Sequence, residues 1–176
     1  MYQAGDTALV ITVPEAEPVV GGWRERFDPM AADGIPAHLT VLYPFLRQDR
    51  IDQDVLGALA GLFGGHRAFD VSFRECGRFP GLLYLAPEPD GPIRALTRAV
   101  HGRWPEAPPY RGRFGDPAPH VTMTQGQDPA VLDTVEADVR DKLPFGAAVR
   151  SVQLVAYDGT VWSSRADFPL GGQQPS

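Results

Sequence analysis

Cysteine is almost absent from this chain of 176 residues, in which Cys76 stands alone. One cysteine cannot form a disulfide bond within the chain, and structural disulfides belong to oxidising compartments. No apolar run approaches the ~20 residues of a membrane-spanning helix, and no basic region precedes the first apolar run, as it would in a secretory signal. We therefore expect a cytoplasmic protein without membrane association, with Cys76 as a small, half-buried residue rather than a nucleophile.

Net positive charge is also missing, since the formal net charge is −6 at pH 7. An acidic chain is a poor candidate for broad binding to the phosphate backbone of nucleic acids. The charge is uneven, however, because residues 67–113 contain eight arginines against five acidic residues. This segment is compatible with a local site for a small phosphate or an RNA end, although exposed helix faces are the better explanation for most of its arginines.

The composition is otherwise that of a globular protein, with 43% hydrophobic and 22% charged residues. A chain of this length normally forms one compact domain with a real core. No long linker separates independent domains. We expect a single domain over residues 1–176 that exists as a monomer.

Hydrophobic periodicity predicts strands alternating with helices. Strands are expected at residues 7–13, 36–45, 68–73, 81–85, 119–124, 148–157 and 160–168, and helices within 14–30 and over about 51–62, 93–104 and 129–139. The same order of elements occurs twice. We therefore predict an α+β fold of two similar lobes, roughly residues 1–78 and 79–170, with antiparallel-rich sheets, flanking helices, a pseudo-two-fold relation and a cleft between the lobes.

A short motif occurs once in each half of the chain, as His-Leu-Thr-Val at residues 38–41 and His-Val-Thr-Met at residues 120–123. Both copies lie in runs typical of strands, where residues i and i+2 share a face. His38 is therefore expected to point the same way as Thr40, and His120 the same way as Thr122. A short pattern needs structural context, and here the context is one strand in each half.

These paired motifs make the chain resemble the 2H phosphoesterase superfamily, which contains 2′-5′ RNA ligase-like proteins and cyclic phosphodiesterases. Its members carry two His-x-Thr/Ser-x motifs, one in each of two similar lobes, and the resemblance covers about residues 7–168. It implies the two-lobed fold and a phosphodiesterase acting on 2′,3′-cyclic or 2′-5′-linked nucleotide or RNA ends. The motifs are weakly specific for the substrate.

The chemistry of imidazole fits this activity. Opening a cyclic phosphate needs one group that takes a proton from water and another that gives a proton to the leaving oxygen, and the ordinary histidine pKa of ~6.5 suits both tasks. Our hypothesis assigns these tasks to His38 and His120, while Thr40 and Thr122 hold the phosphate oxygens. Which histidine is the base cannot be read from the sequence. The simpler alternative is two strand histidines bonded to nearby backbone.

Several other residues are candidate substrate contacts: Tyr43 after the first motif, and Arg111, Arg113 and Phe114 before the second. Tyr110 and Arg78 are lesser candidates, and His66 and His101 lack a threonine at +2. No compact set of metal ligands occurs, so we expect no cofactor and no metal. Zinc held by the two motif histidines is kept as an alternative.

Three further functional hypotheses remain open. One is ligase activity in the reverse direction, and another is hydrolysis of a small cyclic nucleotide such as ADP-ribose 1″,2″-cyclic phosphate. The third is a module that binds a phosphorylated nucleotide or RNA end with little turnover. Two His-Thr pairs favour catalysis, because Arg or Lys would serve binding alone equally well.

Overall fold

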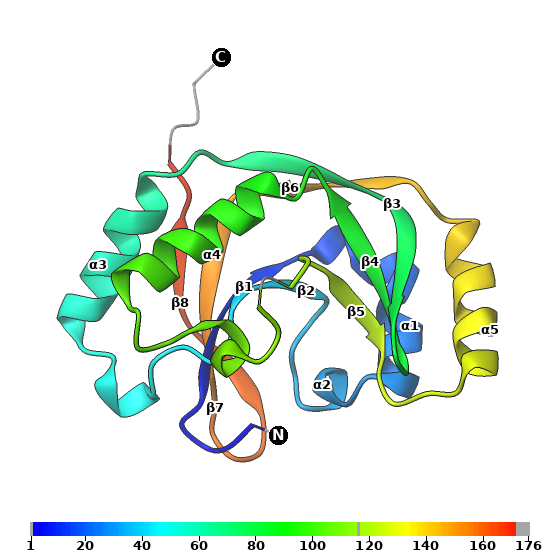
Figure 1. The fold of residues 1–176 in the computed structure, drawn as a ribbon, viewed down its shortest axis with the longest axis horizontal. Coiled ribbons are helices and arrows are strands. Elements are labelled where there is room, and N and C mark those ends of the chain that lie inside the picture. The colour runs from blue at the N-terminus through cyan, green and yellow to red at the C-terminus, as the bar shows by residue number, and fades with distance from the viewer. Residues whose placement is uncertain (1, 116, 172–176) are drawn as a thin grey trace.

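A computed structural model describes residues 2–115 and 117–171, which form two four-stranded antiparallel sheets flanked by helices (Figure 1). The first sheet contains β1 (Thr7–Thr12), β2 (His38–Leu42), β7 (Ser151–Tyr157) and β8 (Trp162–Pro169). The second contains β3 (Phe69–Phe79), β4 (Leu82–Glu88), β5 (Val121–Thr124) and β6 (Phe145–Val149). The predicted α+β fold with two similar sheets is confirmed.

The strand orders of the two sheets reveal an exchange between the halves of the chain. The orders are β2-β1-β7-β8 and β5-β4-β3-β6, so each sheet has a motif strand at one edge and a central strand beside it. The third strand comes from the other half, since β3 joins the second sheet and β7 joins the first. The sheets therefore do not follow the predicted division near residue 78. Periodicity identifies a strand but not its partner.

Five α-helices accompany the sheets within the described residues. They are α1 (Glu17–Phe27), α2 (Pro29–Ala32), α3 (Gln53–Gly64), α4 (Gly91–Arg103) and α5 (Pro129–Arg140). Helix α1 packs against β5 and α4 against β2, so each motif strand is covered by a helix from the other half. Short 3₁₀ turns lie at Pro14–Ala16, Gln48–Arg50 and Pro109–Gly112. No helix of the described part is long and apolar enough to cross a membrane.

Strand β1 is apolar throughout because both of its faces are covered. Leu9 and Ile11 belong to the large core cluster, whereas Ala8 and Val10 join a smaller cluster on the other face of the sheet with Trp162. Burial on both faces produces a continuous hydrophobic run rather than an alternation. The first motif strand pairs antiparallel with this strand.

One local prediction differs from the structure. The single strand expected over residues 148–157 is two strands, β6 and β7, which separate at Arg150 and belong to different sheets. Asp128 occupies the position before α5, but its side chain makes no capping hydrogen bond. Asp52 does cap α3, because its carboxylate accepts a hydrogen bond from the Val55 backbone N–H.

Candidate functional site

The two motif strands lie next to each other although they are far apart in the sequence. Each is an edge strand of its sheet, and β2 and β5 are in contact. On β2, Leu39 and Val41 point into the core with 0% and 2% exposure, while Thr40 is half-buried. The alternation predicted from the sequence is present, and it directs the two motifs toward a shared region between the sheets.

Both histidine rings are held by the same local contact. The Nδ1 atom of His38 lies 2.9 Å from the Pro36 carbonyl oxygen, and Nδ1 of His120 lies 2.8 Å from the Ala118 carbonyl oxygen. A carbonyl oxygen only accepts hydrogen bonds, so Nδ1 carries the proton in each ring. In the neutral tautomer this leaves Nε2 as the atom that can accept a proton, and the same carbonyl at i−2 orients both rings.

His38 is buried, with 8% of its surface exposed. Burial lowers the pKa of His38 to about 4, the hydrogen bond to Pro36 opposes this shift, and the charges of Arg24 and His120 add to it. Arg24 is itself buried, with Nε 3.0 Å from Asp28 Oδ2 and a 2.9 Å hydrogen bond donated to the Ile35 carbonyl. A fixed positive charge therefore favours the neutral form of His38.

His120 is less deeply buried and has aromatic neighbours. Burial lowers its pKa as well, opposed by the hydrogen bond to Ala118. The Phe79 ring meets it edge-on with centroids 5.6 Å apart, and the Tyr84 ring lies 5.4 Å away. Phe79 stacks on Tyr84 at 4.7 Å and is 39% exposed. These two rings form an aromatic wall beside the second motif.

Gly77 makes this wall possible. It pairs with Tyr84 across β3 and β4, and an added Cβ would lie only 2.3 Å from Cζ of the Tyr84 ring. The ring therefore occupies space that any other residue at position 77 would fill.

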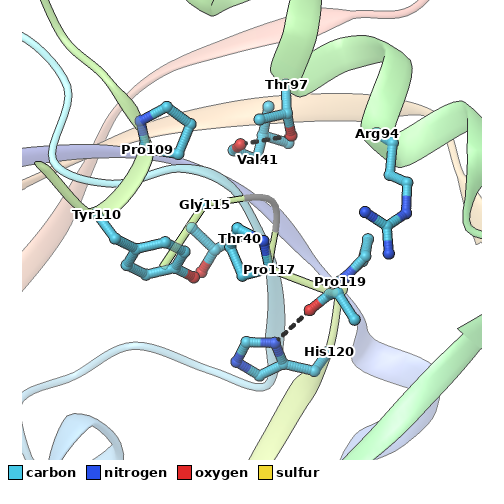
Figure 2. Close-up of a pocket in the computed structure, with 11 residues that line it drawn as sticks. Thr40, Val41, Arg94, Thr97, Pro109, Tyr110, Gly115, Pro117, Pro119 and His120 are labelled. Carbon is cyan, nitrogen blue, oxygen red and sulfur yellow. Dashed lines mark hydrogen bonds between the residues drawn. The ribbon is translucent and has the colours of Figure 1, made fainter. Parts of the chain in front are cut away.

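A pocket between the two sheets contains residues from both motifs (Figure 2). Thr40 from β2, Arg94 and Thr97 from α4, Tyr110 and His120 line it, together with Val41, Pro109, Gly115 and residues 117–119. Arg94 also lies 3.1 Å through Nε from Asp90 Oδ2, and the Thr97 hydroxyl donates a 2.7 Å hydrogen bond to the Val41 carbonyl. The pocket thus combines imidazole, hydroxyl and guanidinium groups.

Tyr110 closes one side of the pocket. Figure 2 shows its hydroxyl beside Thr40, and burial raises the pKa of Tyr110 while the Thr40 hydroxyl opposes that shift by a hydrogen bond. Its backbone is left-handed, with φ 51°, and so is that of Arg111, with φ 57°. Such a conformation costs an L-residue about 1 kcal/mol. The Tyr110 N–H donates a 2.6 Å hydrogen bond to the Tyr43 carbonyl, which ties this loop to the end of β2.

The structure separates the predicted site residues into two groups. Thr40 and His120 line the pocket, while His38 lies on β2 with Thr40, and Thr122 lies on β5, which begins directly after His120. The lesser candidate Tyr110 also lines the pocket.

The predicted substrate contacts Tyr43, Arg111, Arg113 and Phe114 lie outside this lining and remain predictions. Tyr43 packs against Tyr110 and Trp162, with both centroid distances 6.3 Å. Phe114 is 67% exposed, with its ring edge on Tyr110.

Other candidates lie elsewhere. Arg78 pairs with Asp133 at 2.7 Å and with Glu136 at 3.1 Å on α5. His66 follows α3 and His101 is on α4, and neither lines the pocket. Over residues 2–115 and 117–171, no three His, Cys, Asp or Glu side chains are grouped to hold a metal ion.

Four residues of this region were not predicted from the sequence: Arg94, Thr97, Phe79 and Tyr84. The first two lie on a helix whose pattern is that of an ordinary amphipathic helix, and only its packing on β2 brings them to the pocket. A weak signal existed for the aromatic pair, because Gly77 stands opposite Tyr84 in the hairpin that Gly81 closes.

Comparisons with known proteins agree with this architecture. E. coli LigT complexed with 3′-AMP matches with a TM-score of 0.62 and 19% identity over 96% of this chain and 99% of that one. E. coli LigT complexed with NADP+ matches with a TM-score of 0.59 and 18% identity over 97% of this chain and 100% of that one. The protein TT0787 of Thermus thermophilus matches with a TM-score of 0.62 and 17% identity over 96% of this chain and 100% of that one. At these identities the likeness shows the fold alone.

A comparison with curated protein sequences found no match. The model of the 2′-5′ RNA ligase superfamily, in contrast, matches residues 12–161, which include both histidine motifs, the whole second sheet, and β2 and β7 of the first sheet. This chain therefore belongs to the 2′-5′ RNA ligase superfamily.

Proposed function

We propose that this protein is a metal-independent phosphodiesterase that hydrolyses 2′,3′-cyclic or 2′-5′-linked nucleotide or RNA ends. One observation carries the proposal: two imidazoles, one on the edge strand β2 and one directly before the edge strand β5, are held in the same way, each with Nδ1 bonded to the carbonyl at i−2. A pair of rings with Nε2 available in each is the arrangement that acid–base catalysis at one phosphorus requires.

The reaction moves two protons in opposite senses. One histidine takes a proton from water through Nε2 as the water oxygen bonds to phosphorus. The bond from phosphorus to the 2′ or 3′ oxygen breaks, and that oxygen receives a proton from Nε2 of the other histidine, which enters the step as imidazolium. The product is a ring-opened phosphate monoester. With the roles reversed, the same pair could catalyse 2′-5′ ligation.

We assign the base to His38 and the acid to His120. His38 is the more deeply buried ring, and its pKa of about 4 keeps it neutral, as a base must be before it acts. His120 lines the pocket, where a bound phosphate anion would favour its imidazolium form and offset the effect of burial.

The hydroxyls and the guanidinium around the phosphate have a different task. Thr40 and Thr122 lie two residues after the histidines on the same strand faces and can donate hydrogen bonds to the non-bridging oxygens, where charge develops. Arg94 adds a positive charge to the same pocket. The relatives support a nucleotide ligand, since E. coli LigT has been crystallised with 3′-AMP and with NADP+.

The test is the turnover of an adenosine 2′,3′-cyclic phosphate by His38→Ala and His120→Ala. Each substitution should lower kcat/KM by about 10²–10⁴-fold, the usual contribution of a general acid or base. His66→Ala and His101→Ala are matched controls, because each removes an imidazole that belongs to neither motif.

Turnover should survive a chelator in the wild-type protein. Undiminished activity in either motif variant would remove that histidine from the mechanism. Saturable nucleotide binding without any product would instead identify a binding module.

A further inference from the structure

A second hollow lies directly behind the loop that carries Tyr110. It is lined by residues 44–47 after β2, by residues 106–108 and by Arg50 and Arg111. The same two chain segments line both hollows in turn: Thr40, Val41, Pro109 and Tyr110 face the first, and the residues that follow or precede them face the second. The two hollows are therefore neighbours along these two chain segments.

The second hollow is basic in a protein that is acidic overall. Arg47, Arg50 and Arg111 line it against the single carboxylate of Glu106. Arg47 is engaged with Asp6, with Nη1 2.7 Å from Oδ1, and Arg50 approaches Glu106 at 3.7 Å through exposed side chains. Arg111 has no carboxylate partner among the described residues. Its guanidinium is available to an anion, and guanidinium groups match phosphate geometry well.

Tyr110 and Arg111 are neighbours in the sequence, but they line different hollows. Both residues are left-handed, a conformation that L-residues adopt only when the surroundings impose it. The surroundings here are the hydrogen bond from the Tyr110 N–H to Tyr43 and that from the Arg111 N–H to the Pro108 carbonyl at 3.1 Å. The result is one aromatic hydroxyl at the catalytic pocket and one cation at the basic hollow.

We propose that the basic hollow around Arg111 binds a second phosphate of the substrate, so that the preferred substrates carry a phosphate or phosphodiester on the nucleoside 5′ oxygen besides the 2′,3′ group. This inference rests on the proposed function, which places the reacting phosphate in the pocket lined by Thr40 and His120. A 5′ phosphate belongs equally to a small nucleotide and to an RNA end, and both share the chemistry that Arg111 would recognise.

Equilibrium binding tests this without relying on turnover. Calorimetry would compare adenosine 2′-phosphate with adenosine 2′,5′-bisphosphate, and with a dinucleotide that ends in a 2′-phosphate. The bisphosphate should bind about tenfold more tightly, and this preference should decrease as salt is added. A preference for the dinucleotide alone would identify an RNA end as the ligand, and an equal preference for both would identify the phosphate itself.

Substitutions then locate the preference. The quantity to follow is the affinity for the bisphosphate divided by the affinity for adenosine 2′-phosphate. Arg111→Gln should reduce this ratio toward one, whereas Glu106→Gln should increase it by removing the opposing charge. Arg165→Gln makes the same charge change at an exposed residue that lines neither hollow, so it should keep the wild-type ratio. Equal affinities of wild-type protein for all three ligands, or equal losses in Arg111→Gln and Arg165→Gln, would overturn the inference. Absence of hydrolysis would count against the proposed function only.

Discussion

The two motif sites are alike in their backbone and different in their surroundings. Each histidine is oriented by the carbonyl two residues before it, and each lies at the edge of a sheet. The first ring, however, has 8% exposure and a buried arginine nearby, whereas the second lines the pocket beside two aromatic rings. A repeated motif thus fixes where the imidazoles are, and the residues around each repeat set its protonation.

The largest expected effect separates acid from base. A nucleoside 4-nitrophenyl phosphodiester has a leaving group that needs no proton, so the loss caused by removing the acid should shrink on this substrate. We expect the fold loss of activity caused by His120→Ala to be at least about tenfold smaller on the aryl ester than on a cyclic phosphate. The fold loss caused by His38→Ala should be the same on both substrates. Steady-state kcat/KM values provide the measurement. Equal behaviour of the two variants would break the assignment of roles.

A second prediction concerns stability and pH. The folded pKa of His38 is about 4 against an ordinary value of 6.5, so the unfolded chain binds this proton more readily. Stability should therefore fall as the pH drops from about 6.5 to about 4, by up to about 3 kcal/mol from this ring. Urea unfolding of wild type and His38→Gln across this range would isolate the contribution.

His120→Gln provides the comparison for that measurement. Burial also lowers the pKa of His120, but this ring is more open to the pocket, so the corresponding change should be smaller. A wild-type pH dependence that survives in His38→Gln would mean that other groups cause it.

The smallest effect is expected at the aromatic wall. Phe79→Ala removes a partly exposed ring beside His120, where the base or sugar of a bound nucleotide could pack. We expect KM to rise by about three- to tenfold with little change in the free energy of unfolding. Val161→Ala truncates another exposed apolar residue, 41% exposed and outside the pocket lining, and should leave KM unaltered. A large loss of stability in Phe79→Ala would mean that the ring is structural.

Sequence reasoning found what depends on local periodicity. The i, i+2 pattern placed His38 with Thr40 on one strand face, and helical spacing identified α3, α4 and α5 close to their observed bounds. It could not find what depends on pairing between distant segments. Tyr84 comes beside the second motif because β4 pairs with β5, with Tyr84 opposite Thr122. A single sequence contains no direct sign of that register.

The loop before β5 illustrates the same limit at finer scale. Arg111 and Tyr110 are both candidate contacts by sequence, but as consecutive residues they give no sign that they line different hollows. Two successive left-handed residues direct them into separate hollows. Non-glycine residues rarely adopt this backbone, so no propensity would have predicted it.

The exchange of β3 and β7 has a consequence for how the molecule can be divided. Neither half of the polypeptide possesses all the strands of a sheet, and cutting the chain in the turn between β3 and β4 would leave the fragments with unpaired central strands. The pocket lined by Thr40 and His120 therefore needs residues from both halves of the chain, and neither fragment would contain it whole.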